Sequence, residues 1–232
     1  MSGRLVDGIS LSNDSDSYAA MAVQGPNTVT ACKKLFGEDC SLPERFCVAT
    51  FATEFGEVVV CRTGYTGEDG IELFCPTEHA DTWWNRCLQA EATPCGLGSR
   101  DSLRLEKCYP LNGSDLDSEH TPLQAGLSFA VDLTKDDFVG KSVLDEQKAN
   151  GMPSRLVAIK QTGKCPPPRP GYSVYFGDEK VGTLSSGGMS PGLSCGISMA
   201  YVTSGHHQRG TSMEIEIRGK RYPAEIVKKP FV

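Results

Sequence analysis

"RFCVATFATEFGEVVVCRTG", residues 45 to 64, decides the fold of the first part of this chain. β-Branched and aromatic residues fill two short runs, and Gly56 lies between them. This pattern predicts two antiparallel strands joined by a tight turn. The next stretch, "CRTGYTGEDGIELFC" (residues 61 to 75), contains a glycine-rich turn followed by a further apolar run. We expect that run to form a third strand and the segment before residue 25 to extend the same sheet.

Two helical patterns flank these strands. The stretch "GPNTVTACKKLFG", residues 25 to 37, has a proline near its start, a glycine at its end and apolar residues at helical spacing. Its predicted buried side consists of Val29, Cys32 and Leu35 or Phe36. Residues 77 to 92, "TEHADTWWNRCLQAEA", predict a second helix with Thr77 as its N-cap. The predicted buried side of this helix consists of Trp83, Trp84, Cys87 and Leu88.

The later part of the chain has a different pattern. Residues 96 to 111, "GLGSRDSLRLEKCYPL", predict a third helix, in which Ser99 caps the first turn. From about residue 155 onward only strand patterns and turns follow. We therefore predict an α+β fold, with a mainly antiparallel sheet and packed helices in an α+β domain at residues 1–150. A smaller all-β barrel or sandwich domain is predicted at residues 151–232.

Composition and charge exclude several classes of protein. The chain has 232 residues, of which 39% are hydrophobic and 22% charged, and its formal net charge is −6. No apolar run approaches the roughly 18 residues that a membrane-spanning helix needs, and the mild negative charge does not favour nucleic acid. The start, "MSGRLVDGISLSNDSDSY", resembles neither a secretory signal nor a transit peptide. We expect a cytoplasmic protein, or one of the mitochondrial matrix, with its targeting segment absent, if the source is eukaryotic.

Cysteine and histidine are spaced in a way that favours neither disulfides nor a metal site. The ten cysteines include no C-x-x-C pair, and the four histidines form no ligand spacing. Because no secretory context supports a disulfide framework, we expect reduced thiols, most of them in the core.

Glu72 interrupts the apolar run of the third predicted strand. Side chains alternate along a strand, so Glu72 faces away from Ile71 and Leu73. One interpretation is a solvated carboxylate on the outer face of the sheet. The other is a ligand-binding carboxylate, favoured by Tyr65 in the adjoining turn and by Arg100 close behind in the chain. A carboxylate, a guanidinium and an aromatic ring can together hold a flat heterocycle such as an amino-pyrimidine.

Six stretches in order along the chain carry a resemblance to a known family. They are "MAVQGPNT", "RTGYTGEDGIE", "GLGSRDSLRLEKCYPLNGSDL", "TPLQAGLSFAV", "DFVGK" and "GYSVYFGDEKVGTLSSGGMSP". Together they resemble the aminomethyltransferase, or T-protein, of the glycine cleavage system, a transferase of glycine catabolism and one-carbon metabolism. The resemblance implies that tetrahydrofolate is a co-substrate and that the partner is the lipoyl-carrying H-protein. It implies transfer of a one-carbon unit from the aminomethylated lipoyl arm to tetrahydrofolate, with release of ammonia.

The resemblance also implies roles for individual residues. Glu72 matches the glutamate that holds the pteridine in the family, and Arg100 matches a folate-binding arginine. Tyr65, Tyr109 and Phe129 fall where aromatic residues of the family line the folate cavity, and Phe129 stands where many members have tryptophan. These five residues are the predicted folate site.

The chain departs from the family pattern at its start. Family members begin with a further domain's worth of sequence, which carries the aspartate thought to orient or activate the folate nitrogen. Only seventeen residues precede Tyr18 here, and Asp14 and Asp16 belong to a different segment. We therefore expect a truncated relative that lacks the leading region, and we assign no catalytic residue. Any substitute acid would be sought among Asp69, Asp101 and Asp115, which lie within or beside the matching motifs.

Three interpretations stay open on the sequence alone. The chain is an aminomethyltransferase or the larger part of one, a non-catalytic module that binds folate or the H-protein, or an inactive truncated product. Related families add methyl transfer from sulfonium or amine donors and the folate-binding repair factors of iron–sulfur assembly. The signature of those repair factors is matched poorly by "EKCYPLNGSD".

Overall fold

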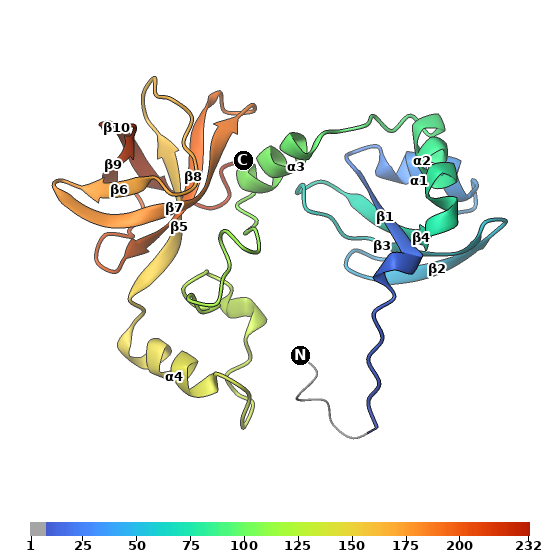
Figure 1. Ribbon diagram of the computed structural model, residues 1–232, viewed down its shortest axis with the longest axis horizontal. Helices are drawn as coiled ribbons and strands as arrows, with labels where there is room; N and C mark the ends of the chain where they lie inside the picture. Colours follow the sequence, from blue (N-terminus) through green and yellow to red (C-terminus); the bar gives the residue numbers. More distant parts are fainter. Residues whose placement is uncertain (1–7) are drawn as a thin grey trace. The chain divides into compact units, whose positions relative to one another are not determined.

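The computed structural model describes residues 8 to 232, which form two compact units (Figure 1). The first unit ends at Cys95 and the second begins at Gly96. An antiparallel sheet with packed helices precedes a closed β-barrel, which confirms the predicted α+β class. Internal packing divides the chain at residues 95 and 96. The predicted domain boundary at residues 150 and 151 follows the change of sequence pattern and remains a prediction.

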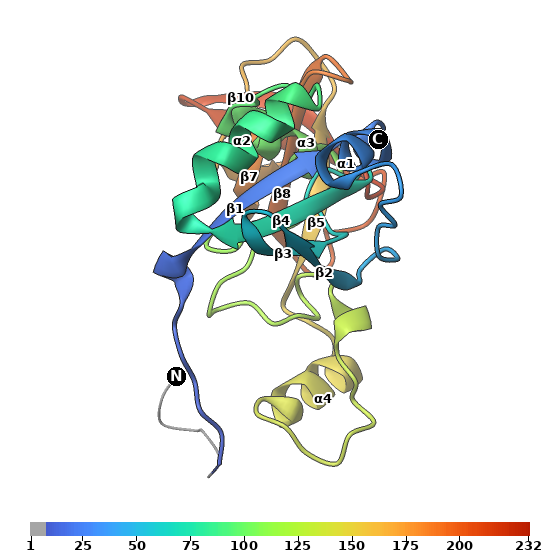
Figure 2. The same ribbon diagram turned by 90° about the vertical axis from the view of Figure 1, so that its right-hand side faces the viewer.

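The first unit contains a four-stranded antiparallel sheet. Its strands are β1 (Tyr18–Gln24), β2 (Val48–Thr53), β3 (Gly56–Cys61) and β4 (Gly70–Pro76). They are ordered β1-β4-β3-β2, which Figure 2 shows from one side of the sheet to the other. The predicted hairpin of β2 and β3 forms around Gly56, whose φ of +88° would strain a residue with a side chain.

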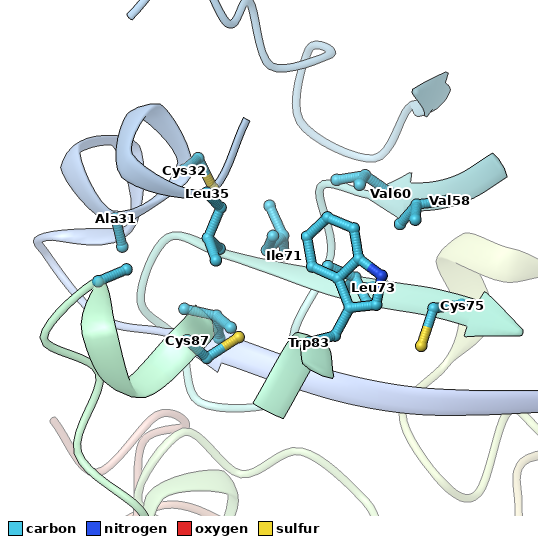
Figure 3. Packing of buried hydrophobic residues seen from close by; sticks show 12 residues of the cluster. Ala31, Cys32, Leu35, Val58, Val60, Ile71, Leu73, Cys75, Trp83 and Cys87 are labelled. Carbon is cyan, nitrogen blue, oxygen red and sulfur yellow. The ribbon is translucent and has the colours of Figure 1, made fainter. Parts of the chain in front are cut away.

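Two helices pack on this sheet. They are α1 (Thr28–Phe36), which contacts β4, and α2 (Ala80–Gln89), which contacts β1 and β4. Two short 3-10 helices, η2 (Ser15–Ser17) and η3 (Thr77–His79), precede β1 and α2. The core between helices and sheet is shown in Figure 3, where the fully buried Trp83 of α2 lies against β4. Side chains of α1, β3 and β4 complete this core, among them Cys32, Leu35, Val58, Val60, Ile71 and Leu73.

The predicted buried faces of these helices were too wide. Val29, Trp84 and Leu88 are 44%, 47% and 39% exposed, whereas Trp83 and Cys87 are buried. Each of the three lies one residue beyond a buried neighbour, which is about 100° around a helix. The sheet covers only a narrow stripe of each helix, so these side chains turn to solvent.

Two predicted helix caps are also wrong. Thr77 belongs to η3, and its hydroxyl donates to the carbonyl of Asp16 at 3.0 Å, while His79 is the N-cap residue of α2. Ser99 lies inside the third helix, whose N-cap is Gly96. In both cases the helix begins a few residues away from the hydroxyl that the sequence offered as a cap.

The second unit is built on a closed six-stranded barrel, yellow to red in Figure 1. Its strand order is β10-β5-β8-β7-β6-β9. Alternate side chains of these strands, such as Val174, Ala200 and Ile215, fill the interior. The strands are β5 (Ser154–Gln161), β6 (Ser173–Phe176), β7 (Glu179–Ser190), β8 (Cys195–Thr203), β9 (Ser212–Ile217) and β10 (Lys220–Val227).

Helices of the second unit lie before the barrel in the sequence. The first, α3 (Leu97–Glu106), contacts β7 and β8, and Leu105 packs in a cluster with Ile197 and Met199. The short helix η4 (Ser128–Ala130) and α4 (Lys141–Asn150) follow. None of the helices within residues 8 to 232 combines the length and apolar character that a membrane span requires.

All ten cysteines lie in the described part of the chain and are free thiols. Four of them, Cys32, Cys75, Cys87 and Cys108, are buried, and burial raises the pKa of each thiol. The expectation that most of the thiols lie in the core is wrong, because the other six are partly or fully exposed. Among residues 8 to 232 no group of three or more histidine, cysteine or acidic side chains is arranged to hold a metal ion.

Candidate functional site

Glu72 lies at the centre of the first unit's sheet. In β4 the side chains of Ile71 and Leu73 are fully buried beneath the helices, while Glu72 is half-buried on the opposite face. The predicted alternation is therefore confirmed. Across the sheet Glu72 is paired in register with Ala22 of β1 and Cys61 of β3, so it has a strand on each side.

The strand residues nearest to Glu72 on this face are mostly small or apolar. Val48 of β2 continues the row of Ala22, Glu72 and Cys61, and it is 61% exposed. The buried side chains of α1 and α2 pack against the other face of the sheet, which carries Val60, Ile71 and Leu73. We call the face with Glu72 the open sheet face; its next row consists of Ala20, Phe74, Val59 and Thr50.

The Glu72 carboxylate has one hydrogen-bond partner among the described residues. The hydroxyl of Thr63, which follows β3, donates to Oε2 of Glu72. Oε1 of Glu72 accepts no hydrogen bond from residues 8 to 232. Because a carboxylate offers about four acceptor sites, Glu72 keeps the capacity to accept two neighbouring donors from a ligand.

Gln24, the last residue of β1, holds the loop that connects β3 to β4. Its Nε2 donates to the carbonyls of Thr63 and Ile71, both at 3.1 Å, and its Oε1 accepts from the Thr66 hydroxyl at 3.2 Å. Two glycines make room for it: a Cβ added at Gly64 or Gly70 would lie 1.8 or 2.3 Å from the Gln24 side chain. Glycine is required at these positions because the glutamine occupies the space.

An ion pair closes the same loop. The Arg62 guanidinium donates two hydrogen bonds to the carboxylate of Asp69, at 3.1 and 2.8 Å, and a third to the carbonyl of Pro43 at 3.1 Å. This guanidinium lowers the pKa of Asp69 below its usual value. Tyr65, one of the predicted site residues, is half-buried within the loop that Gln24 and the ion pair hold.

The other predicted site residues belong to the second unit. Arg100 is exposed in α3, Tyr109 is 37% exposed just after it, and Phe129 is 86% exposed in η4. Glu72 and Tyr65 belong to the first unit. The structure therefore describes the two groups each within its own unit, and their assembly into one folate cavity remains a prediction.

Arg104, one turn after Arg100 in α3, forms a buried ion pair that sequence analysis missed. Its Nη1 donates to Oδ2 of Asp115 at 2.8 Å, and the two side chains are 3% and 0% exposed. The hydroxyl of Ser186 in β7 accepts from Arg104 at 2.9 Å and donates to Asp115 at 2.7 Å. The Leu111 N–H donates to the same carboxylate at 2.8 Å. This network ties α3 and the following turn to the barrel.

Each acid that the sequence offered as a substitute catalytic group is engaged with an arginine. Asp69 pairs with Arg62, and Asp101 and Asp115 both pair with Arg104. Asp115 is fully buried, so it presents no atom to a substrate in this structure. The sequence gives little indication of these contacts, because the partners are far apart in the chain. Gln24 and Thr63 are separated by 39 residues, and Asp115 and Ser186 by 71.

Comparison with known proteins identifies the family. Residues 1–135 match the family model of the GCVT N-terminal domain, and residues 155–232 match that of the glycine cleavage T-protein C-terminal barrel domain. The chain belongs to the glycine cleavage T-protein family. The predicted resemblance is thus confirmed, and the barrel of the second unit is the family's C-terminal domain.

Similar proteins are longer than this chain. An aminomethyltransferase of Anoxybacillus flavithermus is 41% identical over 237 residues, which cover the whole chain and 65% of that protein. That of Bacillus subtilis is 40% identical, over 96% of this chain and 63% of its own length. The crystal structure of the glycine cleavage system aminomethyltransferase T of Bartonella henselae matches with a TM-score of 0.82 and 28% identity, over 93% of this chain and 60% of that one. The chain spans less than two thirds of these relatives.

Proposed function

We propose that this chain is a tetrahydrofolate-dependent aminomethyltransferase of the glycine cleavage system. The one-carbon unit would come from the aminomethyl group on the lipoyl arm of the H-protein, and ammonia would be released. Family membership supports a transferase of this kind, since the relatives are aminomethyltransferases. The observation that carries the proposal for this chain is the geometry of Glu72.

Glu72 suits the amino-pyrimidine edge of a pteridine. The carboxylate lies mid-strand on the open sheet face, and the single contact from Thr63 leaves Oε1 available. An amino-pyrimidine presents two adjacent N–H donors, which match a carboxylate in spacing, and hydrogen bonds to a charged acceptor are the stronger kind. Small neighbours such as Ala22 and Cys61 leave space for a flat ring over the sheet.

The remaining residues of the proposed folate site have binding roles. Tyr65, Tyr109 and Phe129 would contact the aromatic parts of folate, and Arg100 would contact an anionic or carbonyl oxygen. Bound tetrahydrofolate supplies the nitrogen that accepts the one-carbon unit. The chain's own contribution would be to hold that nitrogen within reach of the aminomethyl carbon, and such positioning alone contributes several kcal/mol to a rate.

No acid–base role follows from the described residues. Because Asp69, Asp101 and Asp115 are all ion-paired, none has a claim to protonate or orient the folate nitrogen. We therefore propose that this chain transfers aminomethyl groups far more slowly than its longer relatives. The same observation favours a second candidate function, a non-catalytic module that binds folate or the H-protein. Cytoplasmic location and the absence of a nucleic-acid partner remain part of the proposal.

Ammonia release separates the two functions. The chain is mixed with aminomethylated H-protein and tetrahydrofolate, and ammonia is measured beside the Bacillus subtilis aminomethyltransferase as positive control. Slow release that depends on tetrahydrofolate and is lost in Glu72→Gln supports the enzyme. Release equal to that of samples without the chain, with tetrahydrofolate still bound, supports the binding module.

A further inference from the structure

The feature that carries a further inference is the path of contacts from Gln24 through Thr63 to Glu72. A glutamate side chain has three rotatable bonds, and ligand recognition by its carboxylate requires one orientation. The strand neighbours of Glu72 on either side, Ala22 and Cys61, are too small to hold the carboxylate end in place. Among the described residues, only the Thr63 hydroxyl hydrogen-bonds to it.

The Thr63 hydroxyl can orient the Glu72 carboxylate only if the backbone of Thr63 is itself held in place. Its backbone is held by Gln24, whose Nε2 reaches the carbonyl of Thr63 and the carbonyl of Ile71, each at 3.1 Å. Ile71 precedes Glu72 directly in β4. The Gln24 amide therefore binds both the backbone of Thr63, whose hydroxyl is the donor, and the backbone of Ile71, which adjoins the acceptor Glu72.

Further contacts hold this amide in turn. The Thr66 hydroxyl donates to Gln24 Oε1, so both ends of the amide group are used. Gly64 and Gly70 enclose the side chain so closely that a Cβ at either position would overlap it. The Gln24 amide is therefore confined between the two glycines. Its position fixes the backbone of Thr63, whose hydroxyl orients the Glu72 carboxylate.

We infer that Thr63 and Gln24 are positioning residues that orient the Glu72 carboxylate for a ligand with two adjacent N–H donors. Thr63 acts on the carboxylate directly, and Gln24 acts through the backbone of Thr63. This inference rests on the proposed role of Glu72 in holding the pteridine. It adds that the strength of pteridine binding depends on a hydroxyl that donates to the carboxylate rather than to the ligand.

The experiment measures tetrahydrofolate binding by titration calorimetry in variants of the full 232-residue chain. Thr63→Val removes the hydroxyl and keeps the shape, and we expect it to raise Kd roughly tenfold. Thr63→Ser restores the donor and should bind within about twofold of the wild type. Thr50→Val removes a hydroxyl elsewhere on the open sheet face and should leave Kd unchanged.

A double-mutant cycle shows whether Thr63 acts through Glu72. In a Glu72→Ala background, Thr63→Val should have no further effect on Kd. Gln24→Leu should weaken binding in the wild-type background and add little to Thr63→Val. If the valine variant does not fold, as judged by circular dichroism, Thr63→Ala removes the same hydroxyl. Equal binding by wild type and Thr63→Val, or an equal loss with and without Glu72, overturns the inference.

A ligand-free measurement separates this inference from the proposed function. NMR on chain labelled with carbon-13 glutamate reports the order of the Glu72 side chain. We expect an ordered side chain in the wild type and Thr63→Ser, and rotamer averaging in Thr63→Val. If the wild type does not bind tetrahydrofolate, the proposed function fails. The positioning role of Thr63 is then overturned only if Glu72 is equally ordered in Thr63→Val.

Discussion

Replacing Asp115 with alanine should destabilise the second unit strongly. The substitution leaves the Arg104 guanidinium buried without its main partner, and Arg104 is 3% exposed. It also removes the acceptor of the Leu111 N–H and of the Ser186 hydroxyl, at 2.8 and 2.7 Å. Removing one partner of a buried ion pair costs about 3–5 kcal/mol, because the remaining charge stays desolvated. We expect a loss of this size in the free energy of unfolding.

A matched control lies on the same arginine. Asp101 also pairs with Arg104, at 2.7 Å, but its side chain is 54% exposed. Exposed ion pairs contribute about 0–1 kcal/mol, so Asp101→Ala should cost less than about 1 kcal/mol. Comparing Asp115→Ala with Asp101→Ala shows how much of the loss in stability comes from burial, because each variant removes one carboxylate that pairs with Arg104.

Urea denaturation followed by circular dichroism gives the free energies of unfolding. Amide hydrogen exchange, read by mass spectrometry in α3 and β7, locates the loss, since the Arg104 network joins these two elements. A loss below about 1 kcal/mol in Asp115→Ala, or equal losses in the two variants, would refute the reasoning.

Three further predictions follow from the first unit. The exposed thiols of Cys47 and Cys95 should react with iodoacetamide in the native protein. The buried Cys32 thiol should react only after unfolding, because burial raises its pKa to about 12. Peptide mass spectrometry measures the labelling of each cysteine. Arg62 lowers the pKa of Asp69, so the stability from this pair is fully present above about pH 4 and is lost as the pH falls through the lowered value. The stability difference between wild type and Asp69→Asn should therefore be larger at pH 7 than at pH 3, and an unchanged difference in urea denaturation would count against it. Gly70→Ala should lower the free energy of unfolding by about 1–3 kcal/mol, because the new Cβ displaces the hydrogen-bonded side chain of Gln24. Both tryptophans lie in this unit, so their fluorescence reports its unfolding.

The parts of the fold that depend on local pattern could be predicted from the sequence. The hairpin around Gly56 follows from two β-rich runs and one turn, and the outward direction of Glu72 follows from the two-residue period of a strand. Both of these predictions depend only on residues that are close together in the sequence. The exposure of Trp84 and Leu88 could not be predicted, because the width of a helix's buried face depends on the surface it meets.

The surroundings of Glu72 depend on the sheet's register and on the loop's path. Gln24 and Thr63 are 39 residues apart, and nothing in their local sequence states that β1 and β4 are neighbours. Three glycines lie at positions 64, 67 and 70, and glycine is common where another group approaches the backbone closely. Which side chain approaches, and that it fixes the donor to Glu72, became apparent only in three dimensions.

The most direct test of the account is a binding cycle between Glu72 and the 2-amino group of the pteridine. Calorimetry compares tetrahydrofolate with an analogue in which methyl replaces that amino group, using the wild type and Glu72→Gln. With tetrahydrofolate, Glu72→Gln should raise Kd roughly 5- to 150-fold, which corresponds to about 1–3 kcal/mol for unpaired donors. With the analogue, the two proteins should bind more nearly alike, because the hydrogen bond to the amino group is missing in both. A Kd for tetrahydrofolate that is unchanged by Glu72→Gln would contradict the account and leave Glu72 a solvated residue on the open sheet face.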